Sequence, residues 1–136
     1  MEDESDRVSS MITAKNIGPS TQTSISSGQH ALAADTTPPK GAGEGFRPHE
    51  LLEAALASCT AITLRLVAEE RGIALQRVDV RIELDREQPE KTIFRSRIEF
   101  DPEPSAADRK TLLAASRLCP VRKTLSKSIL FEEMAG

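Results

Sequence analysis

The sequence is poor in aromatic residues, with no tryptophan, no tyrosine and only four phenylalanines among 136 residues. Proteins that bind single-stranded nucleic acids stack the bases on aromatic side chains, and phosphate contacts require a basic surface. The formal net charge of -3 offers no such surface. Nucleic-acid binding is therefore a function class without support in this chain.

The sequence also has little that would direct it to a membrane or a secretory route. Five polar residues interrupt its longest mostly apolar run, 51–68, which argues against a transmembrane helix: Glu53, Ser58, Thr60, Thr63 and Arg65. The first ten residues are acidic and polar and lack the apolar segment of a signal peptide. We expect a disordered tail over 1–10 and, by default, a cytoplasmic location.

Residues that bind metals are scarce, with two cysteines, Cys59 and Cys119, and two histidines, His30 and His49. The cysteines are far apart in sequence and form no CxxC motif, so a four-ligand zinc site is poorly supported. A structural disulfide is rare in a reducing compartment. From composition alone, two buried cysteines acting as small hydrophobic residues are about as well supported as reactive thiols.

Turn residues and apolar periodicity predict the order β-β-β-α-β-β-α-α-β, an α+β fold in a single domain over 11–136. A loop rich in glycine and proline is expected over 36–47, after the first three strands. The other expected elements are strands at 11–17, 20–26, 29–34, 78–85 and 94–100, helices at 48–71, 106–118 and 121–126, and a final strand at 128–132.

The strongest predicted element is the helix from Pro48 to Arg71. Proline fits the first helical turn because its missing N–H would have no partner there, and Gly72 is a suitable stop. The first two-thirds of this helix is apolar almost all round, which predicts burial on every side. One small domain can hardly cover a helix so completely, whereas a second subunit could complete the cover.

The two cysteines have different local settings. Cys59 lies in the middle of the long helix, where apolar burial alone would raise its pKa and make it inert. Cys119 precedes Pro120 and would be the N-cap of a short helix, where the helix dipole and free N–H groups favour a thiolate. Arg122 and Lys123 add positive charge nearby. From the helix dipole and the nearby positive charges alone, Cys119 is expected to ionise more readily than Cys59.

Both settings resemble motifs of the OsmC/Ohr family, the osmotically inducible and organic hydroperoxide resistance proteins, in its OsmC-like branch. Residues 45–52, Gly-Phe-Arg-Pro-His-Glu-Leu-Leu, with Cys59-Thr60 after them, look like the segment that opens the family's central helix. Residues 119–125, Cys-Pro-Val-Arg-Lys-Thr-Leu, resemble its second motif, usually Cys-Pro-Val-His-Arg-Thr-Leu. The segment 29–35 resembles the strand before its glycine-rich loop.

The resemblance implies antiparallel sheets around a long buried central helix in an intertwined homodimer, with the active sites at the dimer interface. It implies a thiol-dependent peroxidase that reduces organic hydroperoxides, with hydrogen peroxide as a further candidate substrate. Cys59 would attack the peroxide and become a sulfenic acid, and Cys119 would resolve it as a disulfide. An external dithiol would reduce that disulfide, and no metal or organic cofactor is needed.

The chain departs from the organic hydroperoxide branch at three positions. That branch has an arginine near its N-terminal strands, but residues 11–35 contain none. Arg47 is a candidate substitute, although a solvated loop charge explains it more simply. The residue after Pro48 is histidine, so Glu50 is the candidate catalytic glutamate, and a first-turn carboxylate matching the helix dipole explains it equally well. Arg122 replaces a histidine.

These departures leave two function classes open. One is the thiol peroxidase, and the other is a non-catalytic member of the same fold that binds a small ligand or senses redox state. A Cys-His-acid hydrolase is poorly supported, because His49 is too far from Cys59 along one helix to contact it.

Overall fold

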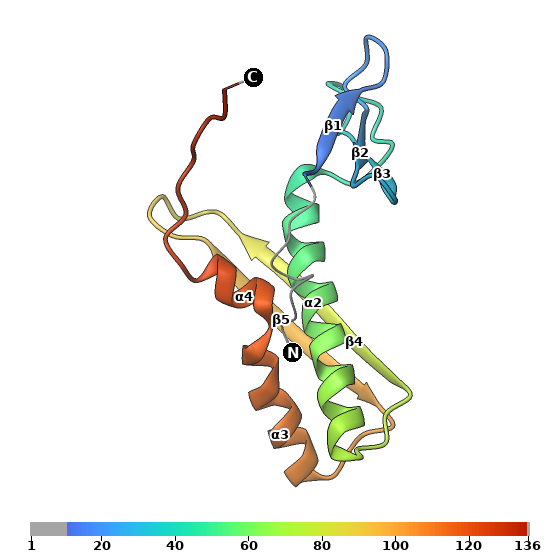
Figure 1. Cartoon of the computed structure of the whole chain (residues 1–136), viewed down its shortest axis with the longest axis vertical. Coiled ribbons are helices and arrows are strands. Elements are labelled where there is room, and N and C mark those ends of the chain that lie inside the picture. Colours follow the sequence, from blue (N-terminus) through green and yellow to red (C-terminus); the bar gives the residue numbers. More distant parts are fainter. Residues whose placement is uncertain (1–10, 136) are drawn as a thin grey trace. The chain divides into compact units, whose positions relative to one another are not determined.

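A computed structural model describes residues 11–135 of the chain. The protein has the predicted α+β class, with antiparallel sheets and one long helix (Figure 1). Its elements are β1 (Thr13–Asn16), β2 (Thr23–Ser26), β3 (Ala31–Ala34), α2 (Pro48–Arg71), β4 (Arg77–Asp85), β5 (Ile93–Asp101), α3 (Ala106–Ala115), η1 (Ser116–Leu118) and α4 (Pro120–Leu125).

Internal contacts divide the chain into two compact units, Met1–Leu52 and Glu53–Gly136, and the boundary falls inside α2. The prediction of a single domain over 11–136 therefore stays a prediction. The predicted tail over 1–10 lies outside the described residues.

The first unit contains a three-stranded antiparallel sheet in the order β1-β2-β3. Thr13 pairs with Ser26 at one end of the first ladder, and the strands are shorter than the sequence predicts. The Ile17 N–H donates to the Gln22 carbonyl at 2.8 Å and closes the turn that contains Gly18-Pro19. Turn residues therefore mark the strand boundaries as expected.

A buried carboxylate, Asp35, organises the predicted glycine- and proline-rich loop. Its Oδ1 accepts hydrogen bonds from the Thr21 hydroxyl at 2.7 Å and the Thr36 N–H at 2.8 Å. Its Oδ2 accepts from the N–H groups of Ala42 and Glu44 at 3.2 and 3.4 Å. These bonds, the one from Thr21 first, hold the pKa of Asp35 below its usual value. The loop that leads into α2 is thus anchored at one carboxylate.

Replacing Gly41 with alanine is expected to lower the free energy of unfolding by about 1–3 kcal/mol, the usual cost of overpacking. A Cβ at Gly41 would lie 2.6 Å from Asp35 Oδ1 and 2.7 Å from Thr21 Oγ1. Urea denaturation measures the loss. Gly18→Ala is the control, because its Cβ would meet nothing within 4 Å and only the positive φ costs stability, about 1 kcal/mol. A Gly41→Ala protein as stable as wild type would contradict the anchored loop.

The long helix α2 begins at Pro48 and ends at Arg71, as predicted, and Gly72 follows it with a φ of 67°. Such a left-handed backbone favours glycine and stops the helix. Within the single chain the helix is not buried on every side, because Ile62 is 60% exposed and Leu66 is 44% exposed. The expectation that a second subunit covers the remaining apolar positions stays a prediction.

By length and composition alone, α2 could also cross a membrane. One such helix is weak evidence, because the core helix of a soluble protein passes the same test. The absence of a membrane partner therefore stays a prediction.

The second unit is built on the antiparallel hairpin of β4 and β5, which pairs Arg77 with Asp101 at one end and Asp85 with Ile93 at the other. Apolar residues of α2, β5 and α3 form its core: Leu64, Ala68, Phe100, Leu112 and Ala115. Ser105 caps α3 as predicted, and its hydroxyl accepts from the Asp108 N–H at 3.1 Å. The core and cap hold the helices of this unit in place.

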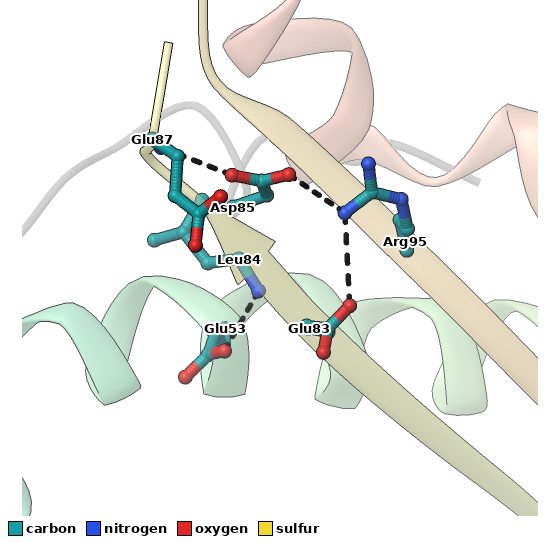
Figure 2. A network of polar contacts seen from close by, with 6 residues as sticks. All are labelled: Glu53, Glu83, Leu84, Asp85, Glu87 and Arg95. Atoms are coloured by element: carbon teal, nitrogen blue, oxygen red, sulfur yellow. Dashed lines mark hydrogen bonds and ion pairs between the residues drawn. The ribbon is translucent and has the colours of Figure 1, made fainter.

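A polar network ties α2 to the hairpin within the second unit. Figure 2 shows Glu53 of α2 accepting a hydrogen bond from the Leu84 N–H of β4, at 2.9 Å. Arg95 of β5 pairs with Asp85 at 2.9 Å and with Glu83 at 3.7 Å. Glu53 interrupts the apolar run of the sequence because it binds an edge N–H that would otherwise lack a protein partner.

The predicted final strand at 128–132 is wrong for the single chain. No strand forms there, and Leu130 and Phe131 are 81% and 90% exposed. A strand exists only when its backbone groups pair with a neighbouring strand. The segment 128–132 pairs with no sheet edge among the described residues.

Candidate active site

The two cysteines meet in the second unit, although 59 residues separate them in the sequence. Cys59 lies in α2 and is half-buried, whereas Cys119 lies between η1 and α4 and is fully buried. Both are free thiols, and Cys119 lies close enough to Cys59 to raise the pKa of the Cys59 thiol. The structure therefore brings together the pair that the sequence singled out.

Two polar groups besides Cys119 act on the Cys59 thiol. One is the backbone N–H of Val121, in the first turn of α4, and the other is the hydroxyl of Thr63, one turn further along α2. Cys119 is the N-cap of α4, as predicted, but its side chain makes no capping hydrogen bond. The expected contact between the Cys119 side chain and the N–H groups at the start of α4 is therefore not formed.

The pKa of the Cys59 thiol lies above its usual value. Burial is the largest cause, and the neighbouring Cys119 raises the pKa further. The hydrogen bonds from Val121 and Thr63 act in the opposite direction. Burial therefore outweighs these two groups at Cys59.

Glu50 and Arg47 form a cap at the start of α2, in the first unit. Oε1 of Glu50 accepts a hydrogen bond from the Arg47 N–H at 2.8 Å, and it lies 3.5 Å from Nε of the same arginine. The N–H first, and the guanidinium second, hold the pKa of Glu50 below its usual value. This is the reciprocal bond of a capping box, so Glu50 has the helix-start role that the sequence left open.

One hollow in the second unit lies away from the cysteines. It has a volume of about 520 Å³ at the end of β4 and is lined by Glu83, Leu84, Asp85, Arg86, Glu87 and Arg95. Its lining holds charges and no nucleophile, and the polar network of Figure 2 occupies its wall. Chemistry requires a reactive group, so we place the candidate site at the thiols and not at this hollow.

Among residues 11–135 no cluster of three or more histidine, cysteine or carboxylate side chains could hold a metal ion. The sequence reasoning missed Thr63 as a site residue. Its position four residues after Cys59 was the available signal, because residues at that spacing share one face of a helix.

An α+β fold with a long helix that carries one of two adjoining thiols defines the class of this protein. The chain belongs to the OsmC-like protein family, because the family model for OsmC-like proteins matches residues 41–133. No curated protein sequence shows a significant match.

Solved structures share the fold at low sequence identity. A candidate osmotic stress induced and detoxification response protein from Psychrobacter arcticus has a TM-score of 0.70 and 22% identity, over 86% of this chain and 87% of that one. An OsmC-like protein from Mycoplasma pneumoniae has a TM-score of 0.66 and 22% identity, over 85% of each chain. The organic hydroperoxide resistance protein OhrB of Bacillus subtilis has a TM-score of 0.61 and 20% identity, over 85% of this chain and 89% of that one.

Proposed function

We propose that the chain is a thiol-dependent peroxidase that reduces organic hydroperoxides, and also hydrogen peroxide, through Cys59 and Cys119. The observation that carries the proposal is the pair of neighbouring free thiols, with Cys59 half-buried and Cys119 fully buried. Membership of the OsmC-like family and the fold shared with an organic hydroperoxide resistance protein support a peroxide-related role.

The proposed cycle has three balanced steps. The Cys59 thiolate attacks one peroxide oxygen, the O–O bond breaks, and the leaving alkoxide takes a proton to become an alcohol. The sulfur, oxidised by two electrons, is then a sulfenic acid, and the Cys119 thiol displaces its hydroxyl as water to form a disulfide. An external dithiol reduces this disulfide by exchange and becomes a disulfide itself.

In this proposal the half-buried cysteine meets the peroxide and the buried cysteine resolves it. A peroxide arriving from solvent reaches a partly exposed sulfur more easily than one with no exposed surface. The Cys119 thiol lies near enough to influence the pKa of Cys59, so the resolving step needs little movement. Glu50 belongs to the proposal as the group that fixes the Arg47 guanidinium at the start of α2.

The same proposal makes the protein a cytoplasmic homodimer. Ile62 and Leu66 leave apolar surface of α2 uncovered, and the exposed segment around Leu130 and Phe131 has strand-like sequence but no sheet partner. A second copy would cover the helix and offer a sheet edge, since exposed apolar surface of this kind favours association.

The test uses the wild-type chain and two peroxides. One equivalent of cumene hydroperoxide is expected to lower the intact mass by two hydrogens, and dithiothreitol with excess peroxide is expected to sustain turnover. Hydrogen peroxide, at matched concentration, gives the substrate preference. The control is protein whose thiols have been blocked with iodoacetamide. It should show neither the loss of two hydrogens nor peroxide turnover. A wild-type chain with no mass loss and no turnover would overturn the proposal.

The second candidate is a non-catalytic member of the fold that binds a small ligand or senses redox state. The raised pKa of Cys59 favours it, because a protonated thiol is a poor nucleophile. On this reading the wild-type mass stays constant in peroxide, and a small apolar ligand raises the melting temperature.

A further inference from the structure

Two arginines lie directly opposite each other on the outer face of the β4–β5 hairpin. Side chains alternate between the two faces of a strand, and Val78, Ile98 and Phe100 pack on the core of the second unit. Arg81 and Arg97, here called the opposed arginines, belong to the other face, are exposed, and are partners in the ladder. Directly opposite residues have Cβ atoms about 4.5–5.5 Å apart, and like charges at that separation destabilise a sheet.

The arginines on either side of this pair have carboxylate partners, whereas the opposed arginines have none. One row along, Nη1 of Arg95 lies 2.9 Å from Oδ2 of Asp85 and 3.7 Å from Oε2 of Glu83 (Figure 2). In the other direction, Nε of Arg77 lies 3.2 Å from Oδ1 of Asp79. Within residues 11–135, no carboxylate forms an ion pair with either opposed arginine. Two positive charges are therefore held side by side without compensation.

A second hollow, with a volume of about 430 Å³, lies at the opposed arginines. Among the described residues that line it, three are arginines and one is a carboxylate: Arg81, Ile82, Glu83, Arg95, Ser96 and Arg97. That carboxylate, Glu83, already pairs with Arg95. The acidic residues of the next row, Asp79 and Glu99, do not line the hollow. Its lining thus has an excess of positive charge.

We propose that this hollow binds the phosphate group of a small phosphate monoester between the guanidinium groups of Arg81 and Arg97. Such a group carries a charge of about −1.5 to −2 at neutral pH, which matches two guanidinium ions. Each guanidinium presents a planar fork of N–H donors that suits phosphate oxygens. Sites for small molecules have volumes of about 300–1,000 Å³, so the hollow has room for the organic part of the ligand as well.

The charge of the whole chain favours a small ligand over a polymer or a membrane. Nucleic acids and anionic lipid surfaces bind extended basic surfaces, and the net charge here is -3. A local excess of positive charge suits a single phosphate group. The site involves neither thiol and lies on the hairpin face that is turned away from the core, so the inference does not depend on the proposed peroxidase.

The experiment measures binding of glycerol phosphate by isothermal titration calorimetry at about 0.1 M salt, where charges beyond about 10 Å are screened. Saturable binding to the wild-type chain is expected. Arg81→Gln and Arg97→Gln are each expected to weaken it about tenfold or more, because hydrogen bonds between two charged groups are lost. Arg81→Lys keeps the charge but not the fork, so it should also bind more weakly than wild type.

Urea denaturation gives a second readout, because the ligand-free and ligand-bound proteins should respond in opposite ways. Without ligand, Arg81→Gln should be at least as stable as wild type, since it removes a repulsion between like charges. With glycerol phosphate, the wild-type midpoint should rise and the variant's midpoint should stay constant. An Arg81→Gln protein that is less stable than wild type without ligand would overturn the proposal, because contacts within the chain would then explain the arginine.

The matched control is Arg71→Gln, which removes the same charge from an exposed arginine at the end of α2 that lines neither hollow. It should bind glycerol phosphate as wild type does. Equal weakening in this control, or no saturable binding to wild type, would show that the proposal is wrong. Phosphatidylcholine vesicles that contain phosphatidic acid present the same group on a membrane. Binding to these vesicles but not to glycerol phosphate would overturn the proposal in favour of a lipid surface.

Discussion

Cys59→Ser is expected to leave no detectable peroxide turnover, whereas Cys119→Ser is expected to keep the first oxidation and lose the cycle. A serine hydroxyl neither ionises at neutral pH nor accepts an oxygen atom from a peroxide, so the first step has no substitute. Without Cys119 the sulfenic acid has no resolving thiol and persists. Turnover is followed with dithiothreitol, and dimedone traps the sulfenic acid for mass measurement.

The contrast between these two variants decides the roles of the cysteines. If Cys119→Ser abolishes the first oxidation, Cys119 is the reacting thiol and the roles are reversed. The structure gives two reasons to expect the opposite result. Cys119 has no exposed surface, and its side chain makes no hydrogen bond with the N–H groups at the start of α4. Before these assays, urea denaturation should show that each variant unfolds with the same midpoint as the wild-type protein.

The rate of Cys59 oxidation is expected to rise about tenfold with each unit of pH until the thiol pKa is reached. Only the thiolate attacks the peroxide, and a pKa raised above its usual value leaves most of the sulfur protonated at neutral pH. The fraction of thiolate therefore grows with pH over the whole neutral and mildly alkaline range. Single-turnover rates with excess cumene hydroperoxide across that range give the profile.

The Cys119→Ser variant provides an internal control for this profile. Cys119 is the second cause of the raised pKa, after burial, so its removal should move the midpoint to lower pH. A rate that stays flat across the neutral range would mean that Cys59 is already a thiolate. In that case a positive charge outside the contacts described here must act on it.

Helix boundaries were the most predictable part of the fold. The proline at 48, the glycine at 72 and the serine at 105 each act through their own backbone or side chain, so local rules located α2 and the start of α3. The strand expected at 128–132 was wrong because pairing is not local. Its apolar run, Ile129-Leu130-Phe131, suits a strand that has a partner edge, and nothing in the segment states whether such an edge exists.

The cysteine site was predictable as a pair of residues but not as an arrangement of donors. The argument for Cys119 assumed that the N–H groups at the start of α4 turn toward their own N-cap. How such groups are used depends on the packing around α4, and the Cys119 side chain makes no capping hydrogen bond there. The influence of Thr63 on the Cys59 pKa was equally hidden, because a helical threonine ordinarily bonds to its own backbone, as Thr60 does.

The complete burial of Cys119 also determines how the oxidised protein can be returned to its starting state. In a disulfide between the two cysteines, an incoming dithiol finds only the Cys59 sulfur within reach of solvent, since Cys119 has none of its surface exposed. The mixed disulfide therefore forms at Cys59, and Cys119 departs as the leaving thiolate. The burial that makes Cys119 a poor target for peroxide thus also makes it the sulfur that leaves in reduction.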